Sequence, residues 1–349
     1  MIQRALRGRV LYVALTIFIV LLYARGIPSM HGPAPSEGIS AAPQASEPLE
    51  WWPSTLDAEA MKRAADRSPH LAVLLSVLSM IAGCLALGGI GLFFWGVGTG
   101  RIRSLWRFRP PRLPGWSFGE LGRILILIVA IASLIPFARF GLEAVFHLVS
   151  DTNLAMTVSM LVLDCFVIVA ILAFARGKRR SVWRVFGCTA QKLPGALATG
   201  LRGYTAVFPW LFVLLFVAME LARRFGWKPP VEPIQQLIFE EDRTGVLALT
   251  VLLACVVGPV AEELLFRGVL YQAIRGRTSR LVAMLTSAAA FSLIHTNVVG
   301  FLPIFLLGCL LADLYERTGS LAGSTAIHII HNALLMSVAL IMRELLAAA

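Results

Sequence analysis

Charged residues are scarce in this sequence. They make up 15% of its 349 residues, whereas hydrophobic residues make up 58%, and about a quarter of a typical soluble domain is charged. The mean hydropathy of +0.78 points the same way. There is too little charge to cover the surface of a soluble domain of this length. The composition therefore excludes that class and indicates a membrane protein, in which apolar residues form long blocks.

Cysteine is also scarce, and the positions of the cysteines exclude two kinds of site. The five cysteines are Cys84, Cys165, Cys188, Cys255 and Cys309. Four of them lie within apolar segments and the other follows a run of basic residues, so nothing indicates a disulfide framework. Their spacing does not match that of zinc ligands, and the sequence has no HExxH motif.

The apolar residues form blocks that approach the length of a membrane span. We predict spans or partial spans at residues 10–23, 72–96, 121–138, 154–174, 204–221, 246–260, 281–294, 298–314 and 323–342. A helix needs about 20 apolar residues to cross the bilayer core, so the predicted fold is all-α, a polytopic transmembrane helical bundle of about eight or nine spans.

The net charge of +11 does not indicate a nucleic-acid partner. The basic residues gather beside alternate spans, at positions 4–9, 101–112, 176–184 and 275–280. An opposite loop carries Glu240, Glu241 and Asp242. The positive-inside rule then predicts a cytoplasmic N-terminus, with the lipid bilayer rather than nucleic acid as the partner of this chain.

The composition divides the chain into four regions. Residues 1–24 resemble a signal sequence without a clear cleavage site, so we expect a retained signal anchor or first span. Residues 25–70 are rich in Pro, Ser, Ala and Glu and are expected to form a poorly ordered extracytoplasmic loop. Residues 71–200 form an accessory transmembrane region, and 201–349 contain all the chemically promising residues. We also expect an outer loop at 225–245.

Two adjacent glutamates lie inside an apolar span, in the segment GPVAEELLFRG that begins at Gly258. Charged residues are costly there, so each suggests a function. Glu263 and Arg267 are four residues apart on one helix face, which predicts an ion pair. Glu262 points about 100° away and is left to face another group. Because proline is tolerated in a first helical turn, a new helical segment could begin at Pro259.

Histidines in later spans are the other candidate site residues. His295 ends the apolar segment FSLIH, and His328 and Asn332 lie four residues apart on one helix face. A lone histidine such as His295 is more often a hydrogen-bonded interior residue than a catalytic one. His331 is less well aligned with Asn332, and we expect it to be a packing residue.

Helix lengths predict which of these residues meet. If residues 246–277 and 281–295 are antiparallel helices, Glu262 and His295 both lie about 24 Å from the turn between them. His328 falls about 12 Å away from that level. It would reach the same level only if the helix before it, at 298–314, were kinked or shortened at one of its glycines or at Pro303.

The order EExxxR, FxxxH and HxxxN on apolar helices resembles the CPBP family of intramembrane proteases. That family includes the CAAX prenyl endopeptidases and bacterial proteins of the bacteriocin-processing or immunity type. The resemblance covers about residues 205–345, with its specific part at 258–332. It implies that residues 201–349 form an intramembrane protease domain, in a multi-pass protein of the bacterial inner (plasma) membrane.

The resemblance also implies an activity and roles for the site residues. The expected activity is endoproteolysis of a membrane-associated protein or peptide substrate, CAAX-like substrates included. In the family the first glutamate and the FxxxH histidine activate water, which here means Glu262 and His295. The HxxxN pair, here His328 and Asn332, stabilises the oxyanion. Glu263 would tune Glu262.

Several alternatives remain open from the sequence. Arg267 is expected to give structural support to Glu263 rather than to take part in the chemistry. Zinc bound by Glu262, His295 and His328 is an alternative to a metal-free mechanism. A catalytically silent relative, acting as a scaffold or in bacteriocin immunity, would keep the same residues. A proton-coupled transporter also uses intramembrane Glu, His and Arg, but it would more often show paired halves, which this sequence lacks.

Overall fold

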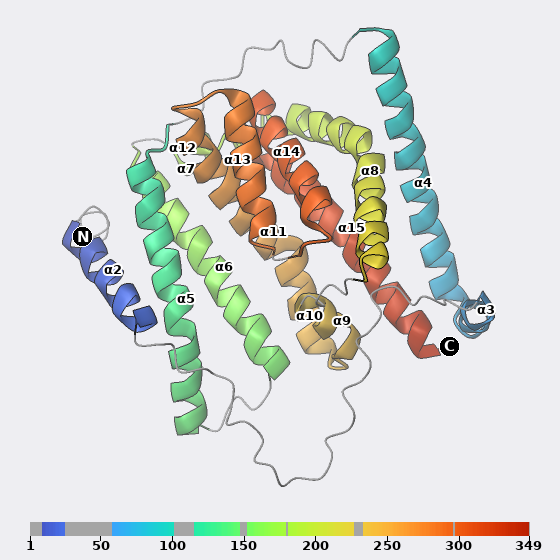
Figure 1. The fold of residues 1–349 in the computed structure, drawn as a ribbon, viewed down its shortest axis with the longest axis horizontal. Helices are drawn as coiled ribbons and strands as arrows, with labels where there is room; N and C mark the ends of the chain where they lie inside the picture. The colour runs from blue at the N-terminus through green and yellow to red at the C-terminus, as the bar shows by residue number, and fades with distance from the viewer. Residues whose placement is uncertain are drawn as a thin grey trace.

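The structure, a computed structural model, describes residues 9–24, 58–100, 115–146, 152–178, 181–226, 233–295 and 297–348. Its first elements are α2 (Arg9–Ala24), α3 (Ala58–Arg67), α4 (Pro69–Gly98), α5 (Phe118–Phe146), α6 (Thr152–Arg176), α7 (Val182–Val185), α8 (Leu193–Arg224) and α9 (Pro233–Glu240). The remaining elements are α10 (Thr244–Leu252), η2 (Leu253–Val257), α11 (Gly258–Glu262), η3 (Glu263–Tyr271), α12 (Gln272–Arg275), α13 (Arg280–Leu293), α14 (Phe301–Thr318) and α15 (Leu321–Ala348). None of the described residues lies in a β-strand, so the all-α prediction is confirmed (Figure 1).

Six helices among the described residues are long and apolar enough to cross a membrane. They are α4, α5, α6, α8, the continuous helix from α10 to α12, and α15. The helices α2 and α13 are apolar but shorter, and α14 carries Asp313, Glu316 and Arg317 near its end. Each predicted span coincides with a helix. The chain is an integral membrane protein built as a polytopic helical bundle.

Two predicted loops contain helices. α3 lies within the loop predicted at 25–70, where strong helix formers such as Ala, Glu, Lys and Arg alternate. α9 lies within the loop predicted at 225–245, and Pro233 occupies its first position, where proline is tolerated. The low hydropathy of these segments concealed their helical character. Residues 25–57 and the basic segment 101–114 lie outside the described residues, so the predictions made for them stay predictions.

Two apolar clusters hold the bundle together. The first joins α5, α6 and α7 to the segment from α11 to α13, through residues such as Ile124, Ile171 and Val269. The second joins α8, α14 and α15, with Phe208 and Ile327 at its centre. Helices of the predicted accessory region thus pack directly on the helix that carries the two glutamates. The division near residue 200 stays a prediction, and α8 runs through that position.

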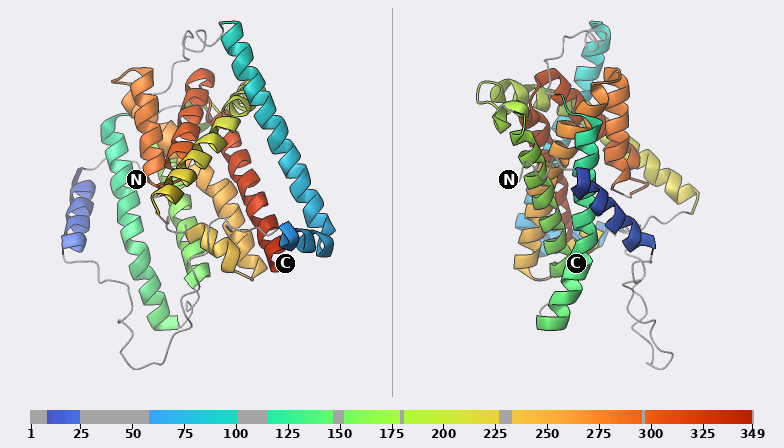
Figure 2. Two further views of the ribbon diagram at one scale, coloured as in Figure 1. Left: turned by 45° about the vertical axis from the view of Figure 1, so that its right-hand side comes forward. Right: turned by 90° about the vertical axis from the view of Figure 1, so that its left-hand side faces the viewer.

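Glycines allow the last two helices to approach their neighbours closely. A Cβ on Gly308 of α14 would lie 3.1 Å from the Cβ of Ala288 on α13. Gly319, with φ of 58°, ends α14 in the left-handed conformation that favours glycine. A side chain on Gly187 would collide with the Gly319 carbonyl, so the α14–α15 turn fits closely over the end of α7. From this turn α15 passes through the bundle beside α8 (Figure 2).

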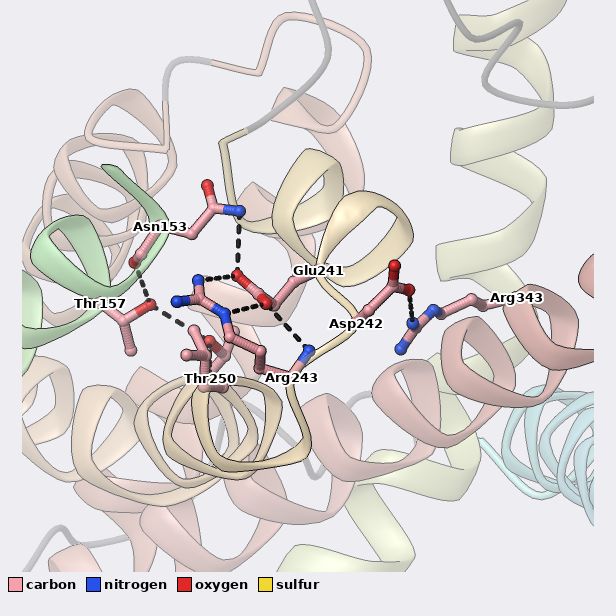
Figure 3. Close-up of polar contacts among 8 residues, drawn as sticks. Asn153, Thr157, Glu241, Asp242, Arg243, Thr250 and Arg343 are labelled. Carbon is pink, nitrogen blue, oxygen red and sulfur yellow. Dashed lines mark hydrogen bonds and ion pairs between the residues drawn. The ribbon is translucent and has the colours of Figure 1, made fainter. Parts of the chain in front are cut away.

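Polar contacts fix the corner between α9 and α10, at the opposite end of the bundle (Figure 3). The Glu241 carboxylate accepts hydrogen bonds from Asn153 Nδ2 at 3.1 Å and from Arg243 Nε at 2.7 Å. The neighbouring Asp242 accepts a hydrogen bond from Arg343 of α15 at 3.1 Å. This α9–α10 corner therefore ties α10 to α6 and α15.

Candidate active site

The two adjacent glutamates lie on one long helix that widens twice. The chain is helical from Thr244 to Arg275, but η2 and η3 have the wider turns of i→i+5 hydrogen bonding. Pro259 follows η2 directly. Proline lacks an N–H and clashes with the carbonyl one turn back, and a wider turn relieves both problems. The helix therefore does not begin anew at Pro259, in contrast to the sequence interpretation. Widened turns of this kind are frequent at functional sites.

The predicted ion pair between Glu263 and Arg267 is confirmed. Arg267 Nη1 lies 2.7 Å from Glu263 Oε1, and both side chains are 0% exposed. Arg267 Nη2 also donates a hydrogen bond to the Gly308 carbonyl at 3.3 Å. Its guanidinium carbon stands 4.3 Å from the ring centre of Phe291. Arg267 thus neutralises Glu263 and joins η3 to both α13 and α14.

His328 joins the two glutamates. Its Nδ1 lies 3.3 Å from Glu263 Oε1, and its Nε2 lies 3.5 Å from Glu262 Oε2. Glu263 is held ionised by Arg267, and an ionised carboxylate can only accept a hydrogen bond. The Nδ1–H of His328 therefore donates to Glu263, which fixes the ring and directs Nε2 at Glu262. The His328 side chain is 2% exposed, whereas that of Glu262 is 26% exposed.

His328 reaches the level of Glu262 for a different reason from the one that the sequence suggested. The helix before it, α14, is unbroken from Phe301 to Thr318, with Pro303 in its first turn. The kink on which the level of His328 seemed to depend is therefore absent, and His328 contacts Glu262 without it. Figure 1 shows α15 running obliquely across the bundle, so counting residues along parallel axes misjudges the level of His328.

Asn332 and His331 face different neighbours. The Asn332 side-chain amide donates a hydrogen bond to the Ala254 carbonyl of η2 at 2.8 Å, and its second N–H is left for another acceptor. His331 Nδ1 lies 2.9 Å from the Tyr204 hydroxyl of α8. His331 is thus a residue of the interior contact between α15 and α8, as predicted.

His295 lies just beyond the end of α13. The Ser287 hydroxyl donates to the Phe266 carbonyl at 3.1 Å, which confirms that α13 packs alongside η3. Continuing along α13 in the antiparallel direction brings His295 toward the level of Glu262. Its Nδ1 lies 2.8 Å from the Phe291 carbonyl. No hydrogen bond or ion pair joins His295 to Glu262 in the described part of the chain, so their joint action on water stays a prediction.

Phe291 forms an aromatic wall between these groups. Its ring centre lies 4.8 Å from that of His295 and 5.6 Å from that of His328. The Arg267 guanidinium carbon also lies over this ring, 4.3 Å from its centre. The FxxxH motif therefore supplies both a histidine and the apolar surface that separates it from the buried ion pair.

Asp164 is a site residue that the sequence reasoning missed. It lies on α6, and its Oδ2 is 3.5 Å from the position of a Cβ on Gly258, one turn before Glu262. Its charge is close enough to that of Glu262 for the two to repel. A lone carboxylate in the middle of an apolar span was the available signal, because such residues are rare in membrane helices unless they are functional.

The arrangement suits proton transfer at Glu262. Glu262 is a partly buried carboxylate with the imidazole of His328 beside it, and Asp164 approaches the same helix one turn earlier, at Gly258. Glu263 contacts the imidazole at Nδ1 and is itself paired with Arg267, so the two residues together add no net charge to the site. A carboxylate placed in this way can take a proton from a bound water and return it to a leaving group.

The described residues do not include a group of three or more His, Cys, Asp or Glu side chains that could hold a metal ion. A catalytic zinc site needs three protein ligands at about 2.0–2.2 Å. Glu262 and His328 face one another, and His295 gives Nδ1–H to the carbonyl of its own helix, which leaves Nε2 as the nitrogen that a metal ion would bind. Zinc held by Glu262, His295 and His328 therefore stays a prediction.

Comparison with known proteins finds similarity over the segment that carries these residues. The family described as Type II CAAX prenyl endopeptidase Rce1-like matches residues 244–334. A candidate membrane peptidase of Bacillus subtilis (strain 168), YdiL, is 30% identical over 77 residues, which are 22% of this chain. The match spans 32% of that relative, about a third of its length. No solved structure matches the chain. The matched segment contains the two glutamates, Arg267, both motif histidines and Asn332, so the part of the chain that carries the site is similar to the Rce1-like family of membrane peptidases.

Proposed function

We propose that this protein is an intramembrane endopeptidase that hydrolyses a peptide bond in a membrane-associated protein or peptide. The observation that carries the proposal is the position of Glu262. It is the accessible carboxylate of the site, and the buried His328 holds it from one side. The similarity to a family of membrane peptidases also supports hydrolysis of a peptide bond.

Glu262 is the general base of the proposed reaction. It takes a proton from water, and the hydroxide adds to the substrate carbonyl carbon to give a tetrahedral oxyanion. The free amide N–H of Asn332 donates to that oxyanion, as electrostatic stabilisation of acyl transfer requires. The intermediate then collapses, the carbon–nitrogen bond breaks, and Glu262 returns its proton to the leaving amine.

The two histidines have separate roles in this scheme. His328 orients Glu262, because its ring lies between the two glutamates, with Nδ1 3.3 Å from Glu263 Oε1 and Nε2 3.5 Å from Glu262 Oε2. His295 gives Nδ1–H to the Phe291 carbonyl, which leaves Nε2 as a hydrogen-bond acceptor for the reacting groups. The scheme needs no metal ion. Zinc analysis of the purified protein tests that point, and a stoichiometric ion whose removal abolishes cleavage would overturn it.

Comparative proteomics of membranes tests the function and identifies the substrate. A strain carrying Glu262→Gln should accumulate uncleaved precursors that the wild-type strain processes. The control is Glu344→Gln, since Glu344 is a half-exposed glutamate at the far end of α15. Its proteome should match the wild type. Identical proteomes in the wild type and the Glu262→Gln strain would favour a catalytically silent relative instead.

A further inference from the structure

Asp164 is the acidic residue of α6, and it lies at the middle of that helix. Twelve residues separate it from Thr152 and twelve from Arg176, or about 18 Å in each direction. No other acidic residue occurs in this helix. An ionisable side chain at this depth costs several kcal/mol unless it is paired or functional. Its position therefore needs an explanation.

A protein partner does not supply that explanation. No hydrogen bond or ion pair joins Asp164 to another residue in the described part of the chain, and its side chain is only partly buried. Its Oδ2 lies 3.5 Å from the position of a Cβ on Gly258 of α11. Glu262 follows one turn later on the same helix. The carboxylate of α6 therefore lies against the helical turn that leads to Glu262.

We propose that Asp164 is a second carboxylate of the active site, which accepts a hydrogen bond from the water that Glu262 activates. The inference rests on the proposed function, because it assigns a role in the same reaction. The water donates one proton to Glu262 as its oxygen attacks the substrate carbonyl carbon. Its other O–H remains bonded and donates to Asp164, which orients the attacking lone pair without taking up a proton.

The surroundings of the two carboxylates fit this division of roles. Glu262 has an imidazole beside it, whereas Asp164 lacks a described partner among the protein side chains. A water held between them would satisfy an acceptor that is otherwise unpaired in an apolar span. Since α6 packs directly against η2, α11 and η3, the separation of the two carboxylates is set by helix packing and not by a loop.

The kinetics of Asp164→Asn in the purified full-length protein test the inference, with the precursor found by proteomics as substrate. The amide keeps the size of the side chain but accepts only a weaker, uncharged hydrogen bond. We expect kcat to fall roughly tenfold to a hundredfold while KM stays unchanged, a loss below the roughly 10²–10⁴-fold of a group that itself transfers a proton, because Asp164 takes up none. The thermal midpoint should stay the same or rise, because the variant removes an unpaired charge.

The outcomes separate this inference from a structural role and from the proposed function. A structural role predicts a lower thermal midpoint with little change in kcat, and that result would overturn the inference. Ser159→Ala is the matched control, since Ser159 lies on α6 and bonds only its own helix; it should cleave like the wild type. If Glu262→Gln abolishes cleavage and Asp164→Asn does not lower kcat, only the role of Asp164 fails. If Glu262→Gln cleaves normally, the proposed function itself fails.

Discussion

At the scale of single residues, Glu263 and Arg267 set the charge of the site. Both side chains are fully buried and 2.7 Å apart. Removing one partner of such a pair strands the other charge and costs about 3–5 kcal/mol. We expect Arg267→Met to lower the free energy of unfolding by that amount, measured by thermal or denaturant unfolding in detergent. The double variant with Glu263→Gln should recover part of the loss, because no charge is then stranded. Equal losses in the single and double variants would remove the ion-pair explanation.

Two histidines three residues apart on α15 should respond differently to substitution. His328→Ala removes the contact with both glutamates, so cleavage should fall by about a hundredfold or more. His331→Ala leaves the Tyr204 hydroxyl without its partner and should cost about 1–3 kcal/mol of stability. Cleavage rates and thermal midpoints of both variants check this. Wild-type cleavage by His328→Ala would exclude the role proposed for that residue.

Spacing along one helix predicted residue contacts well, and contacts between helices less well. The Glu263–Arg267 pair follows from a separation of four residues. The contact of Glu262 with His328 could not be predicted, because it depends on the oblique course of α15. Asp164 was overlooked although it lies alone in an apolar span. Nothing in the sequence around Gly258 indicates that the Asp164 carboxylate lies beside it.

At the scale of elements, the α9–α10 corner holds three helices that carry site residues. Glu241 is 4% exposed and binds Arg243, whose side chain is 53% exposed. We expect Glu241→Gln to lower the free energy of unfolding by about 1–3 kcal/mol, because hydrogen bonds to a buried carboxylate are lost. The adjacent Asp242→Asn is the control. The Asp242 side chain is 98% exposed, so its loss should cost less than about 0.5 kcal/mol.

Unfolding of the two variants in the same detergent measures the difference. Equal stabilities would mean that Glu241 does not fix the corner. A large loss with Glu241→Gln should also lower the rate of cleavage, because Glu241 joins the corner to α6, which carries Asp164. Activity unaffected by a strongly destabilising Glu241→Gln would show that the far end of the bundle does not position the site.

Hydropathy predicted the long helices because a bilayer leaves few alternatives to a helix for an apolar segment. It did not predict α3 and α9, which are polar enough to resemble loops. Pro259 misled the interpretation in another way. Proline usually interrupts a helix, but here the wide turns of η2 accommodate it. A pattern read as a helix start is therefore part of an unbroken span.

At the scale of the whole molecule, basic residues and the α9–α10 corner occupy opposite ends of the bundle. Arg277 lies in the turn between α12 and α13, and Arg275 and Arg280 flank it as the last residue of α12 and the first of α13. The corner contains Glu241 and Asp242. The positive-inside rule predicts that the basic turn faces the cytoplasm and the acidic corner the other side.

Cysteine labelling of intact cells measures this orientation. In a background with the five native cysteines replaced by alanine, Asp242→Cys should react with a membrane-impermeant thiol reagent added outside. Thr278→Cys, in the basic turn, should react only after the membrane is opened, since both positions are exposed on the protein. The reverse labelling pattern would mean that the molecule has the opposite orientation in the membrane. It would also mean that the arginines beside the spans do not direct insertion, because the two positions lie at opposite ends of a bundle that the same helices cross.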